Sequence, residues 1–181
     1  MIKLDSKITK SVLGYFFMNP EAELYLSEIA SLLTLDPSNL SKKLKEFEKE
    51  GLFVSQLRGK ERYYRINCDF SLYDAYKKVF EQYFGIEKEL KDIAGSMKDI
   101  DEAYIFGSYA KERFDASSDI DILVIGRESV VKLNARLLEL ERKFQRDINF
   151  ILMTDSELKE KRKSGDMLVR DIFSSPTIKL K

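Results

Sequence analysis

The sequence predicts an α+β protein with two folded parts joined by a helical segment. Residues 6–18 and 37–50 place apolar side chains at helical spacing, whereas 52–57 and 62–67 alternate between apolar and polar as strands do. A second pair of apolar runs, 103–106 and 120–125, flanks a Gly-Ser turn and a polar stretch. Helical and strand patterns therefore occur in two groups. They predict domains at 1–68 and 98–181 and a helical linker at 69–97.

Composition restricts the class of protein. The 181 residues are 44% hydrophobic and 34% charged, as in a folded globular protein that is not disordered. No apolar run approaches the ~20 residues of a membrane-spanning helix, and residues 1–5 show no signal-peptide pattern. We therefore expect a cytoplasmic protein without a membrane partner. A formal net charge of zero argues against nonspecific binding to nucleic acid.

Cysteine and histidine usage narrows the chemistry. The single cysteine, Cys68, cannot form an intramolecular disulfide, which fits a reducing compartment. The chain has no histidine. Catalytic triads with a histidine base and zinc sites with histidine ligands are therefore excluded.

The N-terminal part has a readable order of elements. The helix 6–18 ends at Asn19-Pro20, and Ser27 is the expected cap of a helix over 28–33. Pro37 suits the first position of the next helix, and Gly51 suits the position just after its end. Two strands then surround a turn at 58–61. The predicted order is helix, helix, turn, helix, hairpin.

This order, with the stretches 27–30, 38–44, 50–52 and 63–66, resembles the winged helix-turn-helix superfamily of bacterial and archaeal metal- and drug-responsive repressors. The resemblance implies binding to double-stranded DNA, with the helix 37–50 in the major groove. Residues 38–65 hold eight basic and four acidic residues, a local charge of +4. The implied base-edge contacts are Ser38, Asn39, Ser41 and Lys42. The implied phosphate contacts are Lys43, Lys45, Arg58, Lys60 and Arg62. The alternative is a winged helix that serves protein contact or dimerisation.

The predicted linker is unusually aromatic. Residues 70–97 keep a broad apolar stripe at helical spacing, with Gly85 as a predicted break between two helices. Such a stripe is too apolar for an exposed tether. It predicts docking between the domains or pairing with a second copy, and a homodimer would suit paired DNA half-sites.

The C-terminal part contains the most informative motif of the chain. Gly107-Ser108 follows the apolar run 103–106, and Asp119 and Asp121 stand at the next run. Side chains alternate along a strand, so both carboxylates project from one face and repel each other unless a cation lies between them. Magnesium is often bound through one or two carboxylates plus substrate phosphates. Gly107 permits a tight turn, and the short helix expected after it favours an anion. A nucleoside triphosphate is the implied ligand, and ATP is the one expected.

The spacing Gly107-Ser108-x10-Asp119-x-Asp121 resembles the signature of the minimal nucleotidyltransferases of the DNA-polymerase-β-like superfamily, over about residues 96–181. The resemblance implies an α/β domain with a small mixed sheet flanked by helices. It also implies transfer of a nucleoside monophosphate from a triphosphate by a two-metal mechanism. Gly107, Ser108 and Lys111 would bind the nucleotide, and Asp119 and Asp121 would bind Mg²⁺ as catalytic residues. Lys111-Glu112 stands where the family often has a glycine, and Glu112 is expected to face solvent.

The third catalytic carboxylate of the family is the open question. The strand predicted at 148–153 carries Asn149 where the family pattern has aspartate, and Asp147 lies two residues earlier on the same side. With Asp147 in the site, we expect an enzyme that modifies a protein or RNA acceptor, in the manner of antitoxins that nucleotidylate a cognate toxin and regulate their own synthesis. With Asn149 there, we expect a transcriptional regulator that only senses nucleotide.

Overall fold

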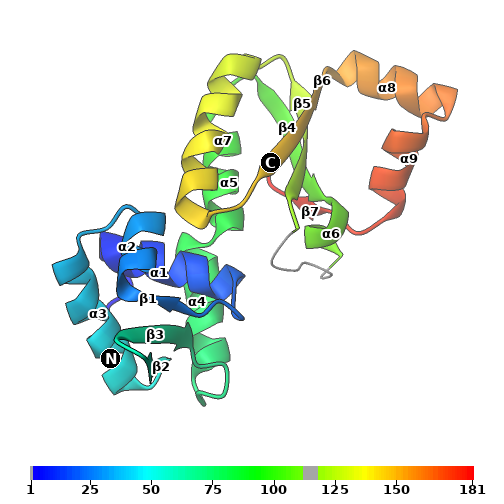
Figure 1. Cartoon of the computed structure of the whole chain (residues 1–181). Helices are drawn as coiled ribbons and strands as arrows, with labels where there is room; N and C mark the ends of the chain where they lie inside the picture. Colours follow the sequence, from blue (N-terminus) through cyan, green and yellow to red (C-terminus); the bar gives the residue numbers. More distant parts are fainter. Residues whose placement is uncertain (1, 112–117) are drawn as a thin grey trace. The chain divides into compact units, whose positions relative to one another are not determined.

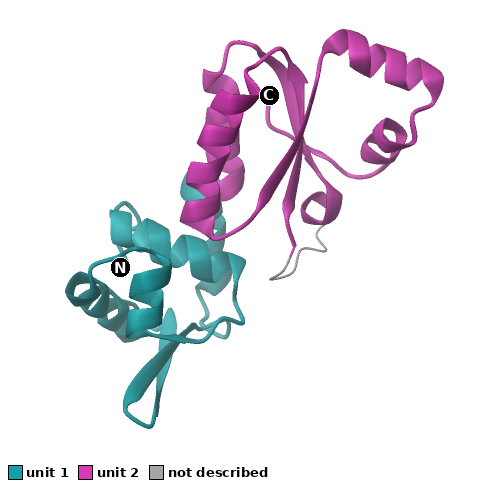
Figure 2. Cartoon of the chain, turned by 45° about the horizontal axis from the view of Figure 1, so that its top comes forward, with its two compact units in different colours: residues 1–85 teal, residues 86–181 magenta. Residues whose placement is uncertain are grey.

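The computed structural model describes residues 2–111 and 118–181. The chain divides into two compact units, Met1–Gly85 and Ile86–Lys181 (Figure 2). The boundary lies inside the segment predicted as a linker, because its two helices belong to different units. The helix α4 (Tyr73–Phe84) packs in unit 1, and α5 (Ile86–Ser96) packs in unit 2. The predicted break at Gly85 is confirmed.

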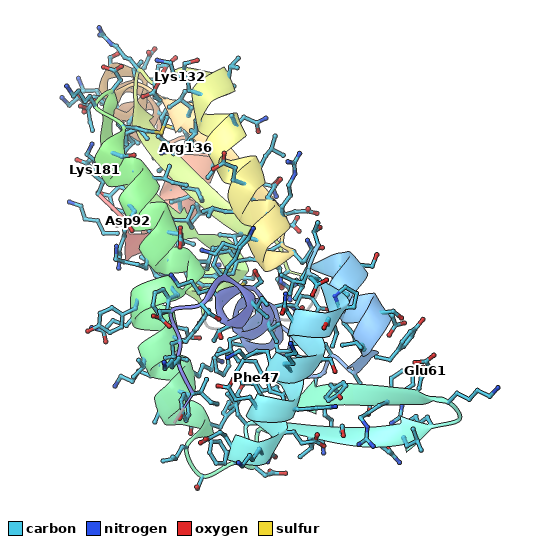
Figure 3. All side chains as sticks on the ribbon, turned by 90° about the vertical axis from the view of Figure 1, so that its left-hand side faces the viewer. Phe47, Glu61, Asp92, Lys132, Arg136 and Lys181 are labelled. Carbon is cyan, nitrogen blue, oxygen red and sulfur yellow. The ribbon has the colours of Figure 1, made fainter. Side chains whose placement is uncertain are left out.

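Unit 1 combines four helices with a three-stranded antiparallel sheet of order β1-β3-β2. Its elements before α4 are α1 (Lys7–Met18), β1 (Leu24–Tyr25), α2 (Leu26–Leu32), α3 (Pro37–Glu50), β2 (Phe53–Arg58) and β3 (Glu61–Ile66). The pairing of Arg58 with Glu61 closes the β2–β3 hairpin around Gly59-Lys60. Figure 3 shows Glu61 near the tip of this hairpin.

Local caps explain where the helices of unit 1 begin and end. The Asp36 carboxylate accepts from the Asn39 N–H at 2.9 Å, and Pro37 follows it. Gly51 ends α3 with φ 87°, in the left-handed region that glycine adopts without a steric penalty. The expected cap at Ser27 is wrong. The helix α2 already begins at Leu26, and the Glu28 carboxylate accepts from the Tyr25 N–H at 3.0 Å.

The core of unit 1 is rich in aromatic side chains. Phe53 lies 5.0 Å from Phe16 and 5.3 Å from Phe47, measured between ring centroids. Phe80 of α4 is 1% exposed and packs 5.4 Å from Phe17. Such pairs add to the burial of apolar area, so α4 is part of this core and not a tether.

Unit 2 is built on a four-stranded mixed sheet of order β6-β5-β4-β7, in which only β5 and β6 are parallel. After α5 its elements are β4 (Ile100–Phe106), α6 (Gly107–Ala110), β5 (Ile120–Gly126), α7 (Val130–Phe144), β6 (Ile148–Met153), α8 (Asp155–Ser164), α9 (Met167–Ser174) and β7 (Ile178–Lys179). The predicted α+β class and the mixed sheet are confirmed.

Helices cover both faces of this sheet (Figure 1). Ile122 and Val124 of β5 face α5 and α7. Leu123 and Ile125 face α8 and α9, where they pack with Leu158, Val169 and Ile172. Because side chains alternate along β5, Asp121 lies on the same face as Leu123, the α8–α9 face. Across the residues that the structure describes, no helix is long and apolar enough to span a membrane.

Candidate active site

The Gly-Ser turn lies directly against one of the two aspartates. Phe106, the last residue of β4, pairs with Asp121 of β5, and α6 begins at the next residue. Gly107 has φ 77°, and a Cβ atom added there would lie 2.5 Å from the Asp121 Oδ2. Only glycine combines this backbone conformation with so close an approach. Its conformation therefore brings the turn and the carboxylate into contact.

The two aspartates share an amide neighbour on β6. Asp121 pairs with Asn149 in the parallel register, and the Asn149 Nδ2 donates to the Asp119 Oδ2 at 3.2 Å. Ile120, between the aspartates, is fully buried and points to the opposite face. Asp119 is exposed and Asp121 half-buried. Both predicted metal-binding carboxylates and Asn149 therefore meet at one end of the sheet.

The electrostatics of Asp121 favour a cation. Burial raises the pKa of its carboxyl above the ordinary value, and the charge of Asp119 raises it further, while hydrogen bonding from Asn149 lowers it. Two ionised carboxylates at this position repel each other, and a divalent cation between them would remove that cost. The oxygen donors of Asp119 and Asp121 therefore fit Mg²⁺ shared with substrate phosphates.

The third position is held by an amide. Asp147 is exposed, and its backbone C=O accepts from the Ile120 N–H at 2.9 Å. Within residues 2–111 and 118–181, no three or more Asp, Glu, Cys or His side chains gather as a metal site. Asn149 is the β6 side chain that bonds to Asp119. The catalytic role of Asp147 stays a prediction.

The other predicted nucleotide contacts lie on α6. Ser108 is half-buried in its first turn, and Lys111 is an exposed residue at its C-terminal end. Glu112 lies outside the described residues. Ser108 directly follows Gly107, which contacts Asp121, whereas Lys111 lies at the other end of α6.

Three of the predicted DNA contacts are engaged within unit 1. Lys43 pairs with Glu46 at 2.6 Å. Arg58 pairs with Glu23 at 2.8 Å, and its guanidinium lies 5.2 Å from the centroid of the Tyr63 ring. Arg62 donates to the Ser55 Oγ at 2.8 Å. The partner Glu23 gave no signal in the sequence, because it lies 35 positions from Arg58.

The remaining predicted DNA contacts are mostly open. Lys42, Lys45 and Lys60 are exposed, and the described part of the chain offers none of them an ion-pair partner within 4.0 Å. Ser38 and Asn39 are exposed in the first turn of α3, and Ser41 is half-buried. Free cations are therefore present both on α3 and at the hairpin tip.

Unit 2 has the carboxylate pair, glycine turn and mixed sheet expected of a nucleotidyl-transfer domain. Residues 88–176 match the family model described as "Polymerase beta, Nucleotidyltransferase". Unit 2 therefore contains a nucleotidyltransferase-like domain over these residues. The family match begins within α5, runs through α9 and stops before β7.

Two solved structures show a limited likeness. Reduced HlyU from Vibrio cholerae is 20% identical, with a TM-score of 0.36 over 45% of this chain and 80% of that one. A Sulfolobus solfataricus protein described as a nucleotidyltransferase is 25% identical, with a TM-score of 0.27 over 41% of this chain and 68% of that one. A search of the curated proteins finds no match.

Proposed function

We propose that this chain is a DNA-binding protein whose unit 2 binds a nucleoside triphosphate with Mg²⁺, ATP being the expected nucleotide. It would transfer the nucleoside monophosphate to a protein or RNA acceptor, such as a cognate toxin, and control its own synthesis. The single observation that supports this most is the contact of Gly107 with Asp121, next to Asp119. That contact puts a tight backbone turn beside the two carboxylates that we propose to bind the metal.

In nucleotidyl transfer, the main task of the protein is to position the triphosphate, the cation and the acceptor. In the transfer, the acceptor hydroxyl oxygen bonds to the α-phosphorus, the bond to the β-phosphate oxygen breaks, and pyrophosphate leaves. Bound Mg²⁺ would neutralise the developing charge. Asp119 and Asp121 would hold the cation, and Gly107 would leave room for the triphosphate. Since the amide of Asn149 cannot accept the proton of the acceptor hydroxyl, that proton would pass to solvent.

Calorimetry tests the nucleotide site. The chain is titrated with ATP in the presence of Mg²⁺, next to the Asp119→Asn, Asp121→Asn double variant. We expect the double variant to lose most of the binding, because its amides cannot neutralise Mg²⁺. A Ser164→Asn variant, far along α8, serves as a control for added amides. Equal affinity of the wild type and the double variant would overturn the proposal. Incubation with labelled ATP, GTP, CTP and UTP then tests transfer to candidate acceptors.

We propose that unit 1 is a winged helix-turn-helix that binds double-stranded DNA through α3 and the β2–β3 hairpin. The free cations Lys42, Lys45 and Lys60 support this. Reversing Lys45 and Lys60 to Glu should weaken binding to the promoter of the chain's own gene. The slope of log affinity against log salt should also fall by about two. Reversal of Lys132 and Arg136, exposed on α7 of unit 2 (Figure 3), removes the same charge elsewhere and is the control. Equal losses in both variants would contradict the proposal.

A homodimer is proposed for the same DNA-bound form. Leu72, Val79 and Tyr83 are 51%, 45% and 60% exposed, and their spacing places them along one side of α4. An apolar stripe of this kind suits a second copy of the helix, and a dimer would present two recognition helices to paired half-sites.

A second function is favoured by Asn149. Asn149 puts an amide, and not a carboxylate base, on β6 beside Asp119. The domain would then bind a nucleotide as a signal, and unit 1 would report it at the DNA. Nucleotide binding that changes DNA affinity, without transfer of label to any acceptor, would identify this function.

A further inference from the structure

A basic hollow lies between α8 and α9 in unit 2. Its volume is about 370 Å³, within the range of small-ligand sites. It is lined by Lys161, Arg162, Gly165, Asp166, Val169, Arg170, Phe173 and Ser174. Gly165, with φ 72°, turns the chain sharply between the two helices, so the last turn of α8 faces one side of α9.

Arg162 lies over an aromatic ring at the edge of this hollow. Its guanidinium carbon lies 4.4 Å from the centroid of the Phe173 ring. The Phe173 ring packs edge-on against Tyr104 of β4, with 5.6 Å between centroids, so the platform under Arg162 is itself fixed to the sheet. The side chain of Arg162 is exposed. A guanidinium plane backed by an aromatic ring is a surface on which an unpaired nucleobase stacks.

The remaining charge of the hollow is positive. Lys161 pairs with Asp166 at 2.9 Å, so these two charges offset each other. Arg170 is exposed, and its ion pair with Asp171 is long at 4.0 Å. Arg162 and Arg170 therefore leave a surplus of two positive charges, and the planar fork of Arg170 suits a phosphate.

The hollow lies on the same side of the sheet as the aspartates. Tyr104, which carries Phe173, pairs with Leu123, and Phe106, two residues further along β4, pairs with Asp121. Two residues of a strand span about 7 Å. Phe173, which lines the hollow, therefore packs on the same face of the sheet as Asp121, against the residue two positions along β4 from the one that pairs with Asp121.

We propose that the hollow between α8 and α9 is an acceptor-side binding site for an unpaired nucleotide, with its base stacked on Arg162 and its phosphate bound by Arg170. The inference rests on the proposed transferase function and specifies the class of acceptor. The nucleotide could be free or the end of an RNA strand, since both present the same base and phosphate.

The platform favours a nucleotide over an acidic peptide. A peptide carboxylate would be recognised by charge alone, and the exposed lysines of α8 could supply the positive charge. The stacked Arg162 adds a flat surface that a carboxylate does not use, whereas a base does.

Fluorescence anisotropy of a labelled single-stranded RNA oligonucleotide on the full chain tests the proposal, with AMP and a glutamate-rich peptide as competitors. Arg162→Ala should weaken RNA binding about tenfold, on the scale of one lost base stack. Arg162→Lys should weaken it nearly as much, because it keeps the charge and loses the plane. Lys163→Ala, on the same helix but outside the hollow, should change affinity less than twofold. Competition by AMP would indicate a free nucleotide, and its absence an RNA strand.

The two proposals fail separately. The Asp119→Asn, Asp121→Asn double variant should lose the binding of ATP with Mg²⁺ and keep its RNA affinity. Arg162→Ala should keep the binding of ATP with Mg²⁺ and bind RNA about tenfold more weakly. Unchanged RNA binding by Arg162→Ala, or an equal loss in Lys163→Ala, would overturn the nucleotide site and leave the triphosphate site standing. Stronger binding of the peptide than of RNA would assign the hollow to a protein acceptor and would also overturn it.

Discussion

Replacing Asn149 with aspartate tests how unit 2 tolerates two carboxylates without a cation. The substitution removes the hydrogen bond from the Asn149 Nδ2 to the Asp119 Oδ2 and places a second negative charge about 3.2 Å from it. Loss of a hydrogen bond to a charged group costs about 1.5–3 kcal/mol. Two unit charges at this separation repel by about 1.3 kcal/mol in water and about 5 kcal/mol at an effective dielectric constant of 20. Because Asp119 is exposed, the lower value applies, and the sum is about 3 kcal/mol.

Thermal unfolding followed by circular dichroism measures this effect. In EDTA, we expect Asn149→Asp to lower the melting temperature of unit 2 by at least about 10 °C. Millimolar Mg²⁺ should restore most of the loss, since a cation bound only by the folded state stabilises it. Asn149→Ala loses the hydrogen bond without adding charge, so it should lose less stability than Asn149→Asp and gain less from Mg²⁺, which Asp119 and Asp121 alone would hold. Equal melting temperatures for Asn149→Asp and Asn149→Ala, with or without Mg²⁺, would refute the reasoning.

Three further substitutions test the Gly107 turn, the Asp121 carboxyl and the exposed side of α4. Gly107→Ala should destabilise unit 2 more than Gly165→Ala in urea unfolding, because both residues have positive φ but only Gly107 lies against a carboxylate; equal losses would exclude the contact as a cause. Since the folded-state pKa of Asp121 is raised, its contribution to stability is fully present below its ordinary pKa of 3.8 and is lost as pH rises through the folded value. Without metal, Asp121→Asn should therefore flatten this part of the pH profile, and a profile like that of the wild type would contradict the assignment. Tyr83→Glu on α4 should shift sedimentation toward a monomer, whereas Val131→Glu, 78% exposed on α7, should not; the same sedimentation for all three proteins would count against the dimer.

The sequence predicted the elements of unit 2 well because local patterns determine them. The alternation in β5 buries Ile120 and Ile122 and leaves Asp119 and Asp121 on the other face, as period two requires. In unit 1, α3 likewise matches its predicted range of 37–50, because its apolar spacing agrees with the start signal Pro37 and the C-cap Gly51. Where pattern and cap agree, the prediction succeeded in detail.

The division of the linker could not be predicted in the same way. Phe80 and Leu90 belong to one continuous apolar pattern, but Phe80 packs in unit 1 and Leu90 in unit 2. A periodic stripe indicates that a helix face is buried, and it does not say against which core. Two contacts could not be predicted for a related reason: the ion pair of Arg58 with Glu23 and the position of Arg162 over Phe173. Both depend on contacts between elements that only the fold brings together.

Asn149 links the folding of unit 2 to its function. An amide donates to one carboxylate and lowers the pKa of the other, so the pair is stabilised without a cation. A third carboxylate would supply a base and a metal ligand, but it would make the folded state depend on bound metal by the ~3 kcal/mol derived above. A domain with Asn149 should stay folded in both its free and its nucleotide-bound form. That property suits a protein that must respond to the presence of nucleotide. We infer that Asn149 makes the site compatible with nucleotide sensing, or with slow transfer, because the domain folds without bound metal.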